Sequence, residues 1–320
     1  MPVADRACPR LVVLRPLGVG DLLTGVPALR ALATAFPEHE RILACPAALE
    51  PLALMIGQVD RVVDTQPLVP LARELQCADV AVDLHGRGPA SHRVLLASQP
   101  RRLIAFAVEQ IAESADMPEW RADEHEVLRW CRMLAEQGIP ADPRDLYLDP
   151  PIGALPPGAV GATIVHPGAA SPSRRWPAER FARVARAELE HGRVVFFTGT
   201  TSERALAEEV ARLAGGGCVL AGRTDLAGLA VLVAAAGLIV SGDTGIAHLA
   251  TAFRTPSIVL FGPTSPAHWG PPAGDSRHVV LWAGRLGDPH GREPDPGLLE
   301  IDTEHVLAAV AALNEQRAAA

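Results

Sequence analysis

The chain has 320 residues, 48% of them hydrophobic, which is enough for two domains with separate cores. Its formal net charge is −8 and aromatic residues make up only 4%, so neither a basic nor a stacking surface for nucleic acid is expected. The five cysteines form no CxxC pair, a pattern typical of reduced cytoplasmic thiols rather than of a zinc site.

No long apolar segment follows the charged N-terminus, so we expect no signal peptide. The nearest candidate for a membrane span, the uncharged stretch 226–242, has only 17 residues and is interrupted by Gly237, whereas a membrane span needs about 20 apolar residues. We therefore predict a buried helix followed by a buried strand there. The expected location is the cytoplasm, with peripheral contact at the inner face of the membrane as an open alternative.

Short apolar runs alternate with helical patterns through the first 150 residues, which predicts parallel strands with helical crossovers. The expected strands are Leu11–Leu14, Arg41–Cys45, Arg61–Val63, Val80–Leu84 and Arg102–Phe106, and the clearest helices are 24–35 and Glu124–Gln137.

A glycine-rich segment, 15–27, follows the first strand. Its G-x-G-x-x-x-x-G spacing lacks the third glycine of the dinucleotide fingerprint, and Cys45 stands where NAD binding requires an acidic residue. The segment presents one carboxylate, Asp21, as the strand gives way to a helix. Asp21 is either a helix cap or a general base.

The segment 83–87, Asp-Leu-His-Gly-Arg, ends another strand of the first block. His85 and Arg87 are candidate acceptor contacts. The alternative, a loop that merely closes the strand, is about equally well supported.

Five prolines between 142 and 159 exclude a long helix or a central strand, so we place the interdomain linker there. The expected domains are 1–150 and 151–300. A terminal helix over 301–320 is a candidate for packing back towards the N-terminal domain.

The second block repeats the alternation, and five consecutive strand ends carry small or polar loops. These predict two Rossmann-like domains, with ligands at the strand C-terminal ends and in a cleft between the domains. The expected strands are Ala162–Val165, Val194–Thr198, Cys218–Ala221, 238–241 and Ser257–Phe261.

The segment 241–248 reads S-G-D-T-G-I-A-H and predicts a strand end, a tight turn and a helix start. Unpaired N–H groups and a partial positive charge at the helix start suit a phosphorylated, hydroxyl-rich ligand, such as a nucleotide sugar. An ordinary Asp cap on a core helix is the equally weighted alternative.

Two further loops of this block carry candidate ligand groups. In 166–177, HPGAASPSRRWP, hydroxyls such as Ser171 and the Arg174 guanidinium suit a diphosphate, whereas Arg175 and Trp176 are expected to be structural. In 198–203, Glu203 either stabilises a helix start or accepts hydrogen bonds from a ribose.

Together these motifs resemble glycosyltransferase family 9, the heptosyltransferase family of lipopolysaccharide core assembly. The matching segments follow the family's order across nearly the whole chain: Gly18–Asp21, His166–Gly168 with Arg174–Pro177, Glu203, Ser241–Gly245 with His248, and Phe261–Thr264. The resemblance implies an α/β fold of GT-B type and an inverting transfer that needs neither metal nor cofactor. The implied donor is a nucleotide-diphosphate sugar, with ADP-heptose first among the candidates.

The resemblance also implies roles for individual residues. Asp21 would be the catalytic base. The donor-binding residues would be Ser171, Arg174, Thr200, Glu203, Asp243, Thr244, Gly245 and His248. The first block carries no comparable acceptor motif, so the predicted acceptor-binding residues, Gly20, His85 and Arg87, rest on their strand-end loops alone. Arg174 stands where the family usually has lysine. The acceptor would be a glycan, a glycolipid or another small molecule. A nucleotide-sugar epimerase and a binding protein without turnover are the alternatives.

Overall fold

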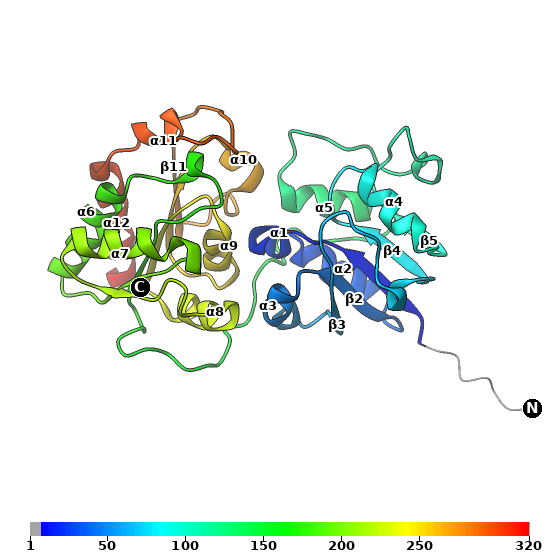
Figure 1. Ribbon diagram of the computed structural model, residues 1–320, viewed down its shortest axis with the longest axis horizontal. Helices are drawn as coiled ribbons and strands as arrows, with labels where there is room; N and C mark the ends of the chain where they lie inside the picture. Colours follow the sequence, from blue (N-terminus) through cyan, green and yellow to red (C-terminus); the bar gives the residue numbers. More distant parts are fainter. Residues whose placement is uncertain (1–7, 320) are drawn as a thin grey trace, which may run out of the picture. The chain divides into compact units, whose positions relative to one another are not determined.

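The computed structural model describes residues 8–319, with side chains through Glu315, and divides the chain into two compact units between Leu146 and Tyr147 (Figure 1). Each unit is an α/β fold built on one parallel sheet.

In the described part of the first unit, five parallel strands lie in the order β3-β2-β1-β4-β5. β1 is buried along nearly its whole length, as expected for a central strand covered on both faces. The strands are β1 (Arg10–Leu14), β2 (Glu40–Cys45), β3 (Arg61–Asp64), β4 (Val80–Asp83) and β5 (Arg102–Ile104).

The helices of the first unit follow the predicted alternation with one break. The helix predicted over 24–35 is α2, and Gly25 separates it from the short helix α1, which ends at Thr24. The helices are α1 (Val19–Thr24), α2 (Val26–Ala35), α3 (Glu50–Met55), α4 (Ala90–Ala97) and α5 (Glu126–Ala135), with short 3₁₀ turns at Ala47–Leu49, Arg73–Leu75 and Ala112–Ser114.

In the described part of the second unit, six parallel strands lie in the order β8-β7-β6-β9-β10-β11. The sequence analysis anticipates five of them but misses the edge strand β11, which pairs with β10 from Ser257 and His278 onward. The strands are β6 (Thr163–His166), β7 (Val195–Phe197), β8 (Cys218–Val219), β9 (Leu238–Gly242), β10 (Ser257–Phe261) and β11 (His278–Trp282).

Helices cover both faces of this second sheet (Figure 1). Alternate residues of β10 show the division: Ile258 and Leu260 pack with α6, α7 and α12, whereas Val259 and Phe261 pack with α9. The helices are α6 (Ala178–Glu190), α7 (Arg204–Ala214), α8 (Leu226–Ala235), α9 (Gly245–Ala252), α10 (Pro266–Trp269), α11 (Pro296–Glu300) and α12 (Thr303–Ala319), with 3₁₀ turns at Pro172–Arg174 and Thr201–Glu203.

The terminal helix α12 belongs to the core of the second unit. Val306, Val310 and Leu313 are buried there against α6 and the sheet. The structure thus groups this helix with the residues before it rather than with the N-terminal domain. The uncharged stretch 226–242 is the helix α8 followed by the buried strand β9, as predicted. None of the described helices combines the length and the apolar character needed to cross a membrane.

In each sheet, the direction in which successive strands are added reverses at one point. Counted within its own unit, each sheet has the strand order 3-2-1-4-5, continued by a sixth strand in the second unit. In such sheets the crossovers on either side of strands 1 and 4 diverge, and ligands bind beyond the carboxyl ends of these two strands. The switch points lie between β1 and β4 and between β6 and β9.

Candidate functional site

Most of the predicted site residues lie in the loops at these two switch points, whereas Thr200 and Glu203 follow the neighbouring strand β7. Because Leu14 pairs with Asp83, the segments 15–21 and 83–87 begin side by side; we call them the β1–β4 site. Because His166 pairs with Ser241, the segments 166–174 and 241–248 do the same, and we call them the β6–β9 site. Sequence analysis identifies the loops, but only the strand order shows which loops are neighbours.

Asp21 is half-buried in the first turn of α1. Its Oδ2 accepts a hydrogen bond from the backbone N–H of Gly18, 3.1 Å away, so Asp21 does cap the helix. This bond occupies one position on one carboxylate oxygen. The capping role and a role as base are therefore compatible, since the bond fixes the orientation of the carboxylate.

His85 and Arg87 leave the end of β4 beside this loop. The backbone N–H of His85 donates to Oδ1 of the buried Asp83 at 2.9 Å. Burial lowers the pKa of His85, against the attraction of Asp83, and the nearby Arg15 lowers it further. His85 is therefore a neutral imidazole at pH 7. Arg87 is exposed and Gly20 is partly exposed.

Asp83 itself is structural. Its Oδ2 lies 2.9 Å from Nδ1 of the buried His92, whose Nε2 lies 2.8 Å from the carbonyl oxygen of Phe106. Burial opposes the charged form of His92, but Asp83 and this carbonyl outweigh it and raise the pKa of His92. The pair ties β4 to α4 and to the end of β5.

The β1–β4 site also contains a residue that sequence analysis misses, Arg15. Its side chain is fully buried, and its Nε donates to the carbonyl oxygen of Asp21 at 2.6 Å. A signal was present, because a charged residue directly after a buried strand needs partners inside the fold.

In the β6–β9 site, Arg174 and Asp243 lie together. Nη1 of Arg174 donates to the backbone carbonyl of Asp243 at 3.3 Å, and the buried Nε has no hydrogen-bond partner within the described protein. Burial raises the pKa of Asp243 to about 6, against the opposing effects of Arg174 and of a hydrogen bond with Thr264. A half-buried cation with unused hydrogen-bonding capacity beside a buried carboxylate is typical of a ligand site.

Glu203 lies where the ends of β6 and β7 meet. Its Oε2 accepts hydrogen bonds from the backbone N–H and the hydroxyl of Thr200, at 2.8 and 2.9 Å. The carboxylate packs so closely on Gly168 that a Cβ there would overlap it. Burial lowers the pKa of the nearby His166, against the attraction of Glu203. Glu203 therefore caps a turn, as one alternative predicts, and its place at the strand ends keeps contact with a ribose as a prediction.

Thr244 is the N-cap residue of α9, and its side chain makes no capping hydrogen bond, so the first N–H groups of this helix have no partner within the helix. Gly245 and His248 lie in the helix, and the His248 ring packs edge-on against Trp269. Ser171 is buried, and its hydroxyl contacts Ser173 and donates to the carbonyl of Gly291 at 3.0 Å. That hydroxyl therefore supports the loop from within.

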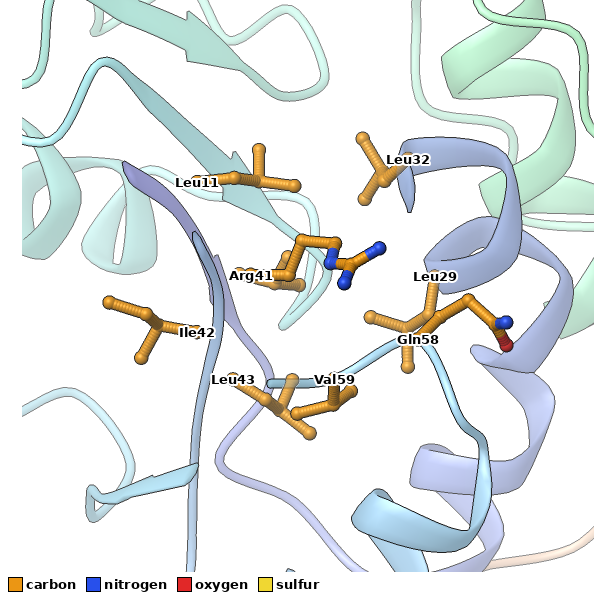
Figure 2. Close-up of a pocket in the computed structure, with 9 residues that line it drawn as sticks. Leu11, Leu29, Leu32, Arg41, Ile42, Leu43, Gln58 and Val59 are labelled. Atoms are coloured by element: carbon orange, nitrogen blue, oxygen red, sulfur yellow. The ribbon is translucent and has the colours of Figure 1, made fainter. Parts of the chain in front are cut away.

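A small cavity in the first unit lies under α2 and is lined by no residue of either site (Figure 2). Its volume is about 10 Å³, roughly the space that one water requires. Its only charged lining residue, Arg41, is paired with Asp60 at 2.6 Å. The lining, which is mainly aliphatic, offers no chemistry, so we assign it no ligand. Among residues 8–319, no group of three or more His, Cys, Asp or Glu side chains is arranged to hold a metal ion.

Comparison with known proteins places this geometry in a family. The model of glycosyltransferase family 9 (heptosyltransferase) matches residues 119–291. The chain is similar to the structure of ADP-heptose LPS heptosyltransferase II from E. coli, with 22% identity, a TM-score of 0.76 and coverage of 96% of this chain and 99% of that one. No curated protein matches at a significant level.

Two further solved structures share the fold. A glycosyltransferase of family 9 from Veillonella parvula has 20% identity and a TM-score of 0.79, with 98% of this chain and 99% of that one covered. The iron-containing dodecameric heptosyltransferase TibC, in complex with ADP-D-beta-D-heptose, has 14% identity and a TM-score of 0.65, with 97% and 77% covered. These likenesses confirm the predicted GT-B type of α/β fold. With a family model that spans more than half of its length, the chain belongs to glycosyltransferase family 9, the heptosyltransferases, and is a glycosyltransferase.

Proposed function

We propose that this enzyme transfers heptose from ADP-heptose to a hydroxyl of a glycan or glycolipid, with inversion at the anomeric carbon and without a metal ion. The observation that carries the proposal is the place of Arg174, whose guanidinium donates to the backbone carbonyl of the buried Asp243 at the switch point of the second sheet. The relatives whose structures are described as ADP-heptose enzymes support the choice of donor.

The β6–β9 site would hold the donor. Arg174 and the N-terminus of α9, with Thr244, Gly245 and His248, would bind the diphosphate, since guanidinium and helix amides both favour phosphate oxygens. Glu203 would accept hydrogen bonds from the ribose. Asp243 would accept hydrogen bonds from the heptose hydroxyls. Arg174 keeps the charge of the family's lysine but offers a planar fork of donors in place of a point charge.

The β1–β4 site would bind the acceptor through Gly20, His85 and Arg87. The acceptor hydroxyl oxygen attacks the anomeric carbon from the side opposite the diphosphate, and Asp21 takes the hydroxyl proton. The bond from the anomeric carbon to the diphosphate breaks, and ADP leaves with its new negative charge stabilised by Arg174 and the helix amides. With these groups holding the leaving phosphate, no step requires a metal. A glycolipid acceptor would bring the protein to the inner face of the membrane.

A transfer assay tests the proposal. The enzyme is incubated with ADP-heptose and lipopolysaccharide from a heptose-deficient strain in excess EDTA. The molecular mass of the glycolipid is then measured by mass spectrometry. We expect the acceptor to gain one heptose, and ADP-heptose to stay intact when acceptor is omitted. Altered heptose without acceptor would favour the epimerase alternative. Donor binding without turnover would favour the binding protein, and activity that returns only with added Mg²⁺ would contradict metal independence.

Arg174→Ala should weaken the binding of ADP-heptose, measured by titration calorimetry. Losing a charged hydrogen bond costs about 1.5–3 kcal/mol of binding free energy, which corresponds to a dissociation constant that is roughly 10- to 150-fold larger. Arg212→Ala is the matched control, because Arg212 is an exposed cation of the same unit at the far end of α7. Equal affinity of the Arg174 variant and the control would remove Arg174 from the donor site.

Asp243→Asn should change stability and donor binding in opposite directions. Because the folded-state pKa of about 6 lies above the ordinary 3.8, the protonated form is favoured in the fold. Without ligand, the wild type should therefore lose up to about 3 kcal/mol of unfolding free energy between pH 4 and pH 8 through this group, which the variant does not lose. The variant should be the more stable protein at pH 8 and bind ADP-heptose more weakly.

Urea unfolding at several pH values measures the effect. Asp225→Asn serves as control, since it makes the same chemical change at an exposed carboxylate that caps α8. If the unfolding free energies of wild type and Asp243→Asn depend on pH in the same way, burial does not raise the pKa of the Asp243 carboxyl group.

Asp21→Asn should cut turnover by roughly 100-fold or more while donor affinity stays nearly unchanged. Asn still accepts the hydrogen bond from Gly18 but cannot take a proton. The control is Asp302→Asn, in which another capping carboxylate, bonded to the backbone of His305 at 2.9 Å, is changed in the same way. If turnover of the Asp21 variant is close to that of the control, Asp21 is a cap only and the base lies elsewhere.

A further inference from the structure

The most heavily bonded side chain near Asp21 is Arg15. Nε donates to the carbonyl oxygen of Asp21 at 2.6 Å, Nη2 donates to the hydroxyl of Thr24 at 3.0 Å, and Nη1 donates to the carbonyl oxygen of Leu84. All three nitrogens of the guanidinium are therefore used inside the protein. With its side chain fully buried, Arg15 cannot itself contact a substrate.

The charge of Arg15 is compensated from α5. Oε1 of Glu126 lies 3.4 Å from Nη2, and the Trp130 ring lies 5.0 Å from the guanidinium carbon. Trp130 in turn donates to Oε1 of Glu126 at 2.8 Å. A buried cation persists only with such a partner set, because an unpaired charge in the interior costs several kcal/mol.

These contacts join four separate pieces of the chain. Arg15 follows β1, Asp21 and Thr24 lie in α1, Leu84 follows β4, and Glu126 begins α5. The Leu84 carbonyl directly precedes His85. One side chain therefore holds the main chain on both sides of the β1–β4 site.

We propose that Arg15 is a positioning residue that fixes the Asp21 carboxylate and the His85–Arg87 loop in a single arrangement; this rests on the proposed role of Asp21 as base. Arg15 acts through the main chain of Asp21 and Leu84. Lysine cannot replace it. Lysine carries all its donors on one nitrogen, whereas Arg15 uses each of its three guanidinium nitrogens for a different acceptor. A displacement of about 1 Å at such a site can cost about 100-fold in rate.

A substitution at Gly25 would disturb the Arg15 side chain independently of any change to Arg15 itself. A Cβ at Gly25 would lie 3.1 Å from Nε and 3.3 Å from Cδ of Arg15, and 3.2 Å from the carbonyl oxygen of Leu22. A methyl group there would press on the guanidinium without removing its charge. Gly25→Ala is thus a second way to displace Arg15 if Arg15→Lys does not fold.

The test is a double-mutant cycle on turnover, with ADP-heptose and lipopolysaccharide from a heptose-deficient strain as substrates. Arg15→Lys should lower kcat by about 10- to 100-fold with little change in donor affinity. In the Asp21→Asn background the same substitution should lower kcat by less than about twofold, because the base that Arg15 positions for proton transfer is already absent.

Amide hydrogen exchange provides the readout that does not depend on turnover. Exchange in 18–25 and 84–87 should be at least about tenfold faster in Arg15→Lys, while the strands of the first unit keep their protection. Arg129→Lys is the matched control. Arg129 is also buried, pairs with Glu126 and packs 4.2 Å from the Trp120 ring, but its hydrogen bonds go to Glu126 and to backbone carbonyls within 121–124. Arg129→Lys should leave both segments protected.

The outcomes separate the two ideas. An equal loss of kcat in the wild-type and the Asp21→Asn backgrounds, or unchanged exchange in 18–25 and 84–87, overturns the positioning role and leaves Asp21 as base. Normal turnover of Asp21→Asn alone overturns the base assignment and, with it, the catalytic meaning of Arg15. A loss confined to the wild-type background, together with faster exchange, supports the inference.

Discussion

The pairing of parallel strands across each switch point is the constraint on which both sites depend. The backbone register that sets Leu14 beside Asp83 and His166 beside Ser241 brings loops from distant parts of the chain to the same sheet edge. Crossovers diverge on either side of these strand pairs, which leaves room beyond them for a ligand. The apolar strands themselves carry no chemistry. Their role is to deliver polar loops to fixed positions.

Each site combines buried charge with a close approach of the backbone. In the second unit, the Glu203 carboxylate needs the absence of a side chain at Gly168, and Asp243 is held in surroundings that disfavour its ionised form. In the first unit, Arg15 is buried with compensating partners. Such groups cost stability or demand complete hydrogen bonding, and they are found where a protein trades stability for function.

The two sites differ in the chemical groups that they offer to a ligand. The β6–β9 site offers a cation, helix amides and a carboxylate, which suit a charged diphosphate and sugar hydroxyls. The β1–β4 site offers a carboxylate and a neutral imidazole, which suit proton transfer and hydrogen bonding to a neutral hydroxyl. Membership of glycosyltransferase family 9 is consistent with this division, since group transfer requires both kinds of site.

Most of the local architecture was predictable from the sequence. Buried parallel strands are continuous apolar runs, so β1, β2, β6, β9 and β10 were found close to their observed bounds. The exceptions have local causes. Gly25 separates the short helix α1 from α2, and the edge strand β11 is only partly buried and lacks a continuous buried pattern.

The amino-acid sequence by itself determined the strand-and-helix alternation, the polar loops at strand ends and the family, because these depend on neighbouring residues. The tertiary structure alone decided which loops meet, that α12 completes the second core, and that Arg15 joins Asp21 to Leu84, 69 residues from Arg15 along the chain. It also decided the raised pKa of Asp243, because burial arises from surrounding elements far away in sequence. Charge and hydrogen bonding act through space, so they become visible only once the chain has folded.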